Sequence, residues 1–525
     1  MSGKHSLGHM FGKFSLKNLD ASDTRQLRNV TLAYIAFHAL LWFVIAILSH
    51  TAPHKDSIEE LNWLQYFDWG YPKFGPIGTW WVHLFVAIFG RAVWVTYLAG
   101  VVNVALMLLV VWRIALLITT PARALMTVVL TSLVIYHNVN GLQVSSNLMQ
   151  LLPTALFLWA TLLAVRHQNW WRWVLLGIAG AICLLTKYAA GIWFAVMGIW
   201  LLLDIRTHNR RAMLGVGIAI AAGAIAMLPH VEWLIRADAP PLRYMERQFG
   251  VEVNHFAEVG KFLMSQLGKL SPLLIALIII NLQFKRDGAT RLPLKGGLNA
   301  TNEERYVSFT TYGPMLVTCV LGAIWIDLNA NWATAYFVVL GLYAIRYVPK
   351  FDTSLALQRV VGVGLVLNIL IACSVGLYYG VIIDMIGKVG RANYPAKLQG
   401  QLLDEVWDAK TRGPLKVVIG ETWVAGVTSV MSRDQPLVVP YGIAKQAPAV
   451  TPDLIKKCGA LIVLDLAEAH RPLTDGMKGF LNQSTQTGSI HMFWNRYKKT
   501  RPIEIKWAII EPESPGACRP TAEKK

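Results

Sequence analysis

Residues 56–81 read DSIEELNWLQYFDWGYPKFGPIGTWW and lie between two long apolar runs. In a helix, Asp56, Glu59 and Glu60 would share one face, because side chains three and four positions apart stack on the same side. Like charges at this spacing repel by roughly 0.2–0.5 kcal/mol per pair, so a cation, a metal ion, a proton or water has to relieve them. Glycines and prolines then break the helix, and Lys73 lies in the break. The stretch therefore predicts a charged site at a membrane surface.

A purely structural interpretation of the same stretch stays open. Asp56 followed by Glu59 fits a capping box, in which the first acid caps the helix and the side chain of the second accepts a hydrogen bond from the backbone N–H of the first. The aromatic residues of the stretch fit a belt at the membrane boundary: Trp63, Tyr66, Trp69, Tyr71, Trp80 and Trp81.

The composition of the whole chain is that of a membrane protein. Of its 525 residues, 54% are hydrophobic and 15% are charged, whereas soluble domains average about a quarter charged residues. The formal net charge of +18 fits either nucleic-acid binding or basic cytoplasmic loops, and the positions of Lys and Arg favour the loops. We therefore expect a polytopic α-helical membrane protein that contacts the lipid bilayer and binds no nucleic acid.

Apolar runs predict about eleven transmembrane helices. They cover, approximately, residues 31–49, 94–118, 124–137, 148–165, 173–186, 190–203, 212–229, 269–282, 308–326, 333–345 and 360–383. Residues 1–30 are basic and lack a cleavable signal pattern, so we expect them in the cytoplasm. The connections then expected inside carry the basic residues Arg123, Arg166, Arg172, Arg206, Arg210, Arg211, Lys285, Arg286, Arg291, Lys295, Arg305, Arg346 and Lys350. The outer connections 138–147 and 327–332 contain no Lys or Arg, and eleven crossings place the C-terminus outside.

The composition changes near residue 388. Residues 416–420 (KVVIG) and 461–464 (LIVL) are short apolar runs of strand type, and residues 398–410 and 452–458 look helical. We expect three parts, which are a cytoplasmic segment 1–30, a transmembrane domain 31–387 with an extracytoplasmic loop 50–93, and a soluble α/β domain 388–525.

The five cysteines divide between the two larger parts. Cys183, Cys319 and Cys373 lie in apolar helices and are expected to be small core residues. Cys458 and Cys518 fall in the predicted outer domain, where the compartment permits a disulfide, and we expect them to lie close enough for one. Their spacing does not resemble a zinc site.

The first loop resembles that of a known superfamily. The run D-x-x-E-x-L-x-W-x-Q followed by W-G-Y-x-K-x-x-P is similar to the first extracytoplasmic loop of the GT-C glycosyltransferases. Within that superfamily, the run most resembles that of the bacterial inner-membrane relatives of protein O-mannosyltransferases and of the lipid A aminoarabinose transferase. In that family a loop acid is catalytic and a Lys-Pro-Pro-Leu-like break follows it. Asp56 matches the acid and Lys73 the lysine, whereas residues 74–77 (FGPI) replace the adjacent prolines. Residues 419–430 (IGETWVAGVTSV) resemble the tails of bacterial members, in which a soluble domain follows the last helix.

The resemblance implies a donor sugar on a polyprenyl phosphate. One carboxylate suffices as general base for an attacking hydroxyl, and the leaving phosphate needs fixed cations. Asp56 suits the first role, with Glu59 or Glu60 as a second acid. Lys73 suits the second role. Lys187, at the outer end of a hydrophobic hairpin, is the next candidate, with snorkelling to the headgroups as the alternative.

Further candidates for substrate binding are less specific. The loop 230–267 offers Tyr244 and three arginines, each of which also fits a solvated helix charge: Arg236, Arg243 and Arg247. His137 lies at the outer end of the third span. Many relatives have an acid near Asn147, and its absence suggests a site with one carboxylate or a second acid drawn from the first loop. No metal is assigned, although a divalent metal ion stays open.

We therefore expect a hexosyl- or pentosyltransferase of GT-C fold in a bacterial inner membrane, with its C-terminal domain in the periplasm. It would move one sugar to a hydroxyl of a lipid, glycan or protein acceptor on the outer face. We expect inversion at the anomeric carbon, because direct displacement by the acceptor is the simplest route with one base. A polysaccharide polymerase or ligase would use the same lipid-linked donors, but the signal lies in the early loop. A secondary transporter would show internal repeats and charges near the bilayer midplane, whereas here the acids cluster in loops.

Overall fold

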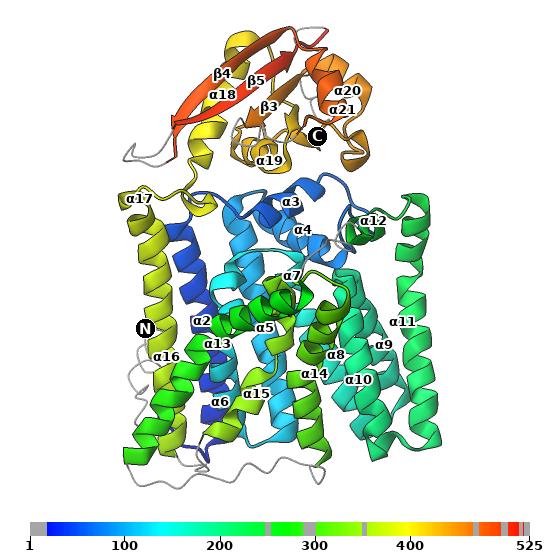
Figure 1. Ribbon diagram of the computed structural model, residues 1–525, viewed down its shortest axis with the longest axis vertical. Coiled ribbons are helices and arrows are strands. Elements are labelled where there is room, and N and C mark those ends of the chain that lie inside the picture. The colour runs from blue at the N-terminus through cyan, green and yellow to red at the C-terminus, as the bar shows by residue number, and fades with distance from the viewer. Residues whose placement is uncertain are drawn as a thin grey trace, which may run out of the picture.

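The computed structural model describes residues 18–246, 254–286, 301–348, 354–465, 472–494, 502–513 and 518. Most of the expected cytoplasmic segment, the candidate Arg247 and the expected inner-loop residues Arg291, Lys295 and Lys350 lie outside the described residues. Helices dominate one large body, and a smaller unit that contains a β-sheet sits at one end of it (Figure 1).

Sixteen labelled helices belong to the large body and its loops. They are α2 (Thr24–Ser49), α3 (Lys55–Trp63), α4 (Ile77–Phe89), α5 (Val93–Ile118), α6 (Pro121–Ser132), α7 (Ser146–Met149), α8 (Leu151–His167), α9 (Trp170–Thr186), α10 (Gly191–Leu203), α11 (Arg210–Arg236), α12 (Pro240–Glu246), α13 (His255–Arg286), α14 (Asn302–Ile324), α15 (Leu340–Ala344), α16 (Ser354–Leu377) and α17 (Ile383–Met385). Helix α5 packs against α2, α4, α6 and α8.

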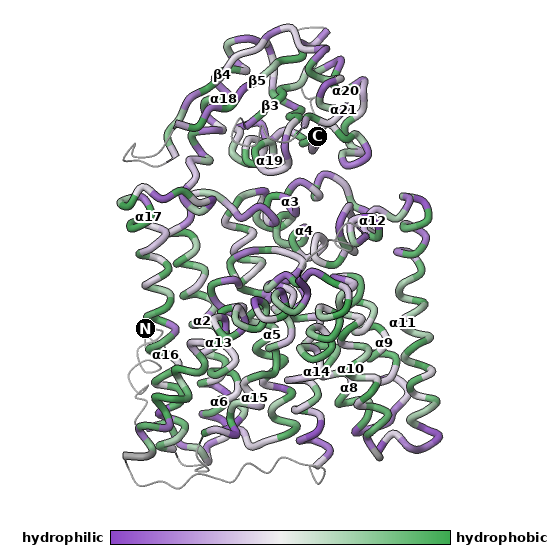
Figure 2. Tube along the Cα trace, in the orientation of Figure 1, coloured by the Kyte–Doolittle hydropathy of each residue, from purple (hydrophilic) through white to green (hydrophobic). Residues whose placement is uncertain are grey.

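Length and composition set how many helices can cross a membrane, since a crossing needs about 20 apolar residues. Within the described ranges seven helices qualify, and an eighth crossing results if the bent pair Pro121–Ser132 and Ile135–Leu142 is one span. Helices α9 and α10 are apolar but shorter. Figure 2 shows the hydrophobic residues along the helices of the body. The polytopic helical fold is confirmed, whereas about eleven crossings stay a prediction.

The third expected span is broken. Helix α6 is bent by 89° against the following 3₁₀ turns η2 (Ile135–His137) and η3 (Val139–Leu142). The break frees backbone carbonyls, which must find new partners away from water. The His137 ring Nδ1 lies 2.8 Å from the Thr131 carbonyl oxygen, and Asn138 donates to the Ser132 carbonyl at 3.1 Å. Polar residues at this helix end therefore stabilise the break.

One cluster of charges joins three predicted inner connections. Arg206 pairs with Asp204 at 2.6 Å and with Glu303 at 3.1 Å, and Arg166 reaches Glu303 at 3.4 Å. The ends of α8 and α10 and the start of α14 therefore meet at the same end of the body.

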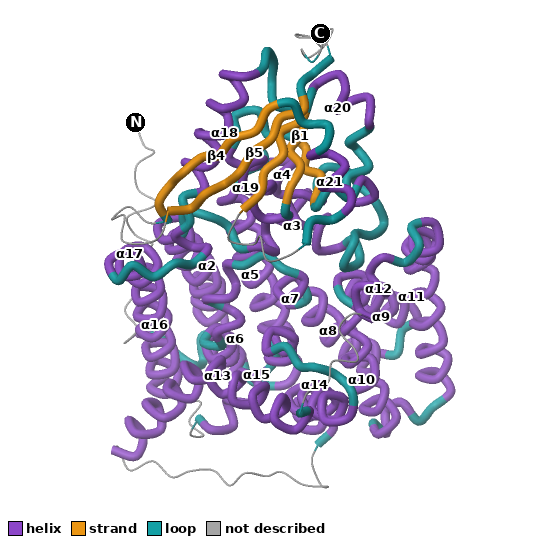
Figure 3. Tube along the Cα trace, turned by 45° about the horizontal axis from the view of Figure 1, so that its top comes forward, coloured by secondary structure: helices purple, strands orange, loops and turns teal. Residues whose placement is uncertain are grey.

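The small unit holds a five-stranded sheet in the order β2-β1-β3-β5-β4 (Figure 3). Its strands are β1 (Val417–Gly420), β2 (Leu437–Pro440), β3 (Ala460–Asp465), β4 (Gln486–Phe493) and β5 (Pro502–Ile510). Strand β1 pairs in parallel with β2 and β3, and β5 pairs antiparallel with β3 and β4. All four residues of β1 are buried, as expected for a central parallel strand.

Four helices accompany the sheet: α18 (Ala396–Lys410), α19 (Thr422–Met431), α20 (Pro452–Cys458) and α21 (Asp475–Leu481). The strand-type runs correspond to β1 and β3, and the two expected helices correspond to α18 and α20, so these local predictions are confirmed. The sequence did not indicate β2, β4 or β5. The boundaries 388–525 and a periplasmic location stay predictions.

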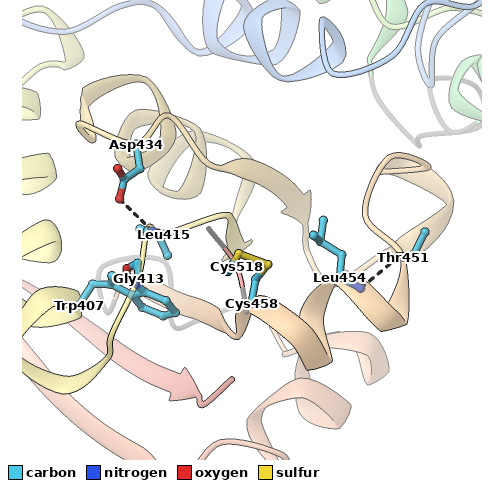
Figure 4. The surroundings of a disulfide bond; sticks show 8 residues. All are labelled: Trp407, Gly413, Leu415, Asp434, Thr451, Leu454, Cys458 and Cys518. Atoms are coloured by element: carbon cyan, nitrogen blue, oxygen red, sulfur yellow. Dashed lines mark hydrogen bonds between the residues drawn. A yellow bond between two sulfur atoms is a disulfide. The ribbon is translucent and has the colours of Figure 1, made fainter. Parts of the chain in front are cut away.

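The expected disulfide is present. Cys458 and Cys518 are bonded, with Cα atoms 5.0 Å apart (Figure 4). Among the other cysteines, Cys183 is buried as expected. Cys373, however, is exposed on α16, so its prediction as a core residue is wrong, because an apolar run does not show which face of its helix packs against protein.

The small unit rests on the acidic helix of the first loop. Helix α19 packs against α3, and both views place them together (Figure 1 and Figure 3). Asn62 donates to the Thr422 carbonyl at 3.2 Å, and Lys55 pairs with Glu421 at 3.3 Å. A Cβ added to Gly426 would lie 2.2 Å from Ile58, so this glycine is what allows the close approach.

Candidate active site

The first loop, the broken third span and the turn η6 (Ala330–Phe337) meet around one pocket. The pocket has an empty volume of about 300 Å³, space open to solvent included. Its lining is almost entirely polar and consists of His54, Asp56, Asn140, Gln143, Ser145, Asn147, Leu148, Asn331 and Thr334. Turns and short helices, rather than long helices, supply this lining.

Asp56 is the carboxylate that lines this pocket. It lies in the first turn of α3, which begins with His54 as the N-cap residue. The Asp56 amide donates to the His54 ring at 3.4 Å. In the part of the chain that the structure describes, no hydrogen bond or ion pair engages the Asp56 carboxylate. The carboxylate is therefore free to accept a proton from a molecule in the pocket.

Glu59 is engaged by the predicted cation. Lys73 donates to both oxygens of the Glu59 carboxylate at 2.7 Å, and its ammonium group lies 5.5 Å from the centre of the Tyr244 ring. Burial raises the pKa of Glu59, with Lys73 opposing the shift. Burial lowers the pKa of Lys73, but attraction to Glu59 outweighs it and the net pKa is raised. The structure thus brings three predicted residues together and holds the lysine charged.

Glu60 is buried deeper in the loop. Its carboxylate accepts a hydrogen bond from the Thr79 hydroxyl at 2.6 Å. Burial raises the Glu60 pKa to about 8, because the charged form is poorly solvated there. Glu60 therefore holds its proton at neutral pH and links α3 to α4.

Lys187 points toward the pocket wall and not toward solvent. The residue is 9% exposed, and its ammonium group donates to the Asn147 side-chain oxygen at 2.5 Å. It also lies 5.9 Å from the centre of the Trp332 ring. Burial lowers the pKa of Lys187 to about 8, and the Asp56 carboxylate opposes this shift. Lys187 therefore contacts the lining of the pocket, whereas a snorkelling lysine would extend toward the headgroups.

A close backbone contact fixes the two lysines relative to each other. Gly75 lies two residues after Lys73, and Leu185 lies two residues before Lys187. A Cβ added to Gly75 would lie 2.1 Å from the Leu185 carbonyl oxygen, so only glycine fits here. The glycine that replaces a proline of the family pattern thus packs the loop against the end of α9.

The remaining predicted residues lie elsewhere. Arg243 is ion-paired with Asp238 and is half exposed. Arg236, which pairs with Asp68 at 2.9 Å, is also exposed. His137 is fully buried at the break after α6 and does not line the pocket.

Sequence reasoning missed several residues around the pocket, above all Lys269 on α13. Its ammonium group donates to the Asn140 side-chain oxygen at 3.2 Å and lies 5.3 Å from the centre of the Tyr136 ring. A signal was present, because Lys269 opens the apolar run 269–282, and ionisable residues in such runs are functional candidates. Thr334, in contrast, lay at the start of the expected span 333–345, and Asn331 lay in the expected outer connection 327–332; neither carried a signal.

No group of three or more His, Cys, Asp or Glu side chains that could hold a metal ion occurs in the described ranges. The pocket lining offers one carboxylate and one imidazole, Asp56 and His54, beside amide and hydroxyl groups.

Comparisons with known proteins agree with this architecture. A family model described as dolichyl-phosphate-mannose-protein mannosyltransferase matches residues 73–233. The lipopolysaccharide core galacturonosyltransferase RgtA of Rhizobium johnstonii is 24% identical over 447 residues, which cover 82% of this chain and 87% of RgtA. The lipid A galacturonosyltransferase RgtD of the same organism is 22% identical, over 58% of this chain and 63% of RgtD.

Among solved structures, ArnT from Cupriavidus metallidurans bound to undecaprenyl phosphate superposes with a TM-score of 0.64 at 11% identity. The match covers 91% of this chain and 98% of that one. At this identity the likeness concerns the fold, and it extends over both the helical body and the small unit.

Proposed function

We propose that this chain, a membrane glycosyltransferase of the GT-C superfamily that uses polyprenyl-phosphate-linked donors, transfers one sugar to a hydroxyl group with Asp56 as general base. The observation that carries the proposal is the contrast among three neighbouring acids. Glu59 is paired with Lys73, and Glu60 is buried with a raised pKa. Asp56 alone among the three lines the pocket.

The chemistry follows from this arrangement. The acceptor hydroxyl enters the pocket and gives its proton to Asp56 as its oxygen attacks the anomeric carbon of the donor. The bond between that carbon and the phosphate oxygen breaks, and the phosphate leaves with the electron pair. Direct displacement of this kind inverts the anomeric configuration.

The leaving phosphate gains negative charge, which fixed cations stabilise in a poorly hydrated site. Lys73 and Lys187 suit this role. Burial lowers the pKa of Lys187, and for both lysines the Asp56 carboxylate acts in the opposite direction to burial, so both lie within its electrostatic reach. Lys73 is oriented by Glu59, whereas Lys187 donates to the neutral side-chain oxygen of Asn147.

The relatives suggest the sugar and the acceptor. RgtA and RgtD are named as galacturonosyltransferases that act on the lipopolysaccharide core and on lipid A. We therefore propose galacturonic acid, or a closely related hexuronic acid, as the sugar and a lipopolysaccharide-type glycolipid as the acceptor. The pocket would then face the periplasm at the outer surface of the inner membrane, with the N-terminus in the cytoplasm.

The test is transfer activity of Asp56→Asn in purified, lipid-reconstituted enzyme. We expect activity lowered about 100-fold or more with unchanged thermal stability, because the amide cannot take the proton. Asp68→Asn is the matched control, since Asp68 lies in the same loop and pairs with the exposed Arg236. Full transfer activity in Asp56→Asn would refute the assignment, and Glu59 would be tested next.

A further inference from the structure

We infer that Lys269 is a specificity-determining residue that binds the carboxylate of the donor sugar and makes the enzyme prefer uronic acid donors. The inference rests on the proposed function, which it deepens by naming the residue that reads the sugar.

The geometry places the Lys269 ammonium group at the wall of the Asp56 pocket. It donates to the side-chain oxygen of Asn140, which lines the pocket. The ring of Tyr136 lies under the ammonium group, and the Tyr136 hydroxyl donates to the Ala330 carbonyl at 2.5 Å. Ala330 is adjacent to the pocket-lining Asn331. The aromatic ring and its hydrogen bonds therefore hold the lysine beside the pocket.

The charges around the pocket do not balance. Lys187 and Lys269 each donate to an asparagine of the lining, Asn147 and Asn140 respectively. Among the residues that the structure describes, neither lysine lies within ion-pair distance of a carboxylate, and Asp56 is the one carboxylate in the lining. Partly buried cations without a counter-charge are costly. Anionic groups on a bound substrate would supply the missing charge.

A polyprenyl-phosphate donor supplies one anion, which the proposed function assigns to Lys73 and Lys187. A neutral sugar would leave Lys269 without a counter-charge, whereas a uronic acid carries a second anion on the sugar ring. The pocket amides, among them Gln143 and Asn331, can bind sugar hydroxyls as donors or acceptors. They cannot distinguish a carboxylate from a hydroxymethyl group as strongly as a cation can. Lys269 is the group that makes this distinction.

The experiment compares two donors that differ only at the sugar C6 position, polyprenyl-phosphate galacturonic acid and polyprenyl-phosphate galactose. A hydrogen bond to a charged group contributes about 1.5–3 kcal/mol, so we expect wild-type kcat/KM to favour the uronic acid by about 10- to 100-fold. Lys269→Gln keeps a donor for Asn140 but removes the charge. It should lower kcat/KM for the galacturonic acid donor by about the same factor and change that for the galactose donor by less than about threefold.

Two further variants separate specificity from folding. Lys269→Arg restores the charge and should restore most of the preference. Lys261→Gln on the same helix is the matched control, because Lys261 is exposed and pairs with Glu258 at 2.6 Å; its kinetics should match those of wild type.

The possible results separate the two proposals. Equal use of both donors by wild type, or equal loss of both donors in Lys269→Gln, would overturn the role of Lys269 and leave the proposed glycosyl transfer standing. Transfer of neither sugar by wild type would overturn the proposed function and this inference with it.

Discussion

The contact between Gly75 and Leu185 gives the sharpest structural prediction. In Gly75→Ala the new Cβ would start 2.1 Å from the Leu185 carbonyl oxygen, whereas ordinary contact begins at 3.4 Å. The two backbones would have to separate by about 1.3 Å. Overpacking of this kind typically costs about 1–3 kcal/mol. Because Lys73 and Lys187 flank this contact, the separation also moves the two proposed phosphate-binding groups apart.

A shift of about 1 Å at catalytic groups can lower a rate about 100-fold, so we expect kcat/KM of Gly75→Ala to fall by about that factor. The assay is transfer activity in reconstituted enzyme, with thermal unfolding measured on the same preparation. Gly78→Ala is the matched control, because its Cβ would make ordinary contacts, with the Met149 side chain at 3.5 Å and the Glu60 Oε1 atom at 3.8 Å. Wild-type activity in Gly75→Ala, or an equal loss in Gly78→Ala, would refute the reasoning.

Three further predictions use other parts of the chain. The folded protein keeps the Glu60 proton up to about pH 8, whereas the unfolded chain loses it near 4.5, so stability should fall as the pH rises through this window. Glu60→Gln should therefore flatten the dependence of Tm on pH, and parallel Tm curves of wild type and variant would contradict this. Replacing Cys458 by serine should destabilise the small unit by about 2–4 kcal/mol, measured by denaturant unfolding, whereas Cys373→Ser, at an unbonded exposed cysteine, should not. A reporter fused after Lys388 should be active only outside the cytoplasm, and cytoplasmic activity would place the small unit on the other side.

The first loop could be predicted from sequence because its information is local. The spacing of Asp56, Glu59 and Glu60 and the break that carries Lys73 are visible within 26 residues, and the loop has both features. The capping-box alternative is wrong, because His54 caps α3 and Asp56 lies in its first turn.

The rest of the pocket could not be predicted because distant breaks assemble it. Residues 124–137 and 333–345 looked like spans, since periodicity cannot distinguish a short apolar run that crosses a membrane from one that turns inside it. In the structure the first run bends by 89°, and the second forms η6 and α15. Asn140 and Asn331 were expected in the two outer connections, and the sequence did not show that η3 and η6, which hold them, line one pocket. The strands β4 and β5 were missed for a related reason, because alternating exposure in β4 gives no continuous apolar run.

Asp56, Glu59 and Glu60 lie on one short helix, α3, and each of the three carboxyl groups has a different environment. Glu59 is neutralised by a lysine that donates to both of its oxygens. Glu60 is buried beside Thr79 with a pKa of about 8, so it keeps its proton and carries no charge at neutral pH. Asp56 is the acid of this helix that lines the pocket, and among the described residues it has no hydrogen-bond or ion-pair partner for its carboxylate. The pairing of Glu59 and the burial of Glu60 leave Asp56 as the candidate for the proposed base. Changing Lys73 would leave Glu59 as an uncompensated charge on the same face, so it should disturb the proposed base as well as the proposed phosphate site.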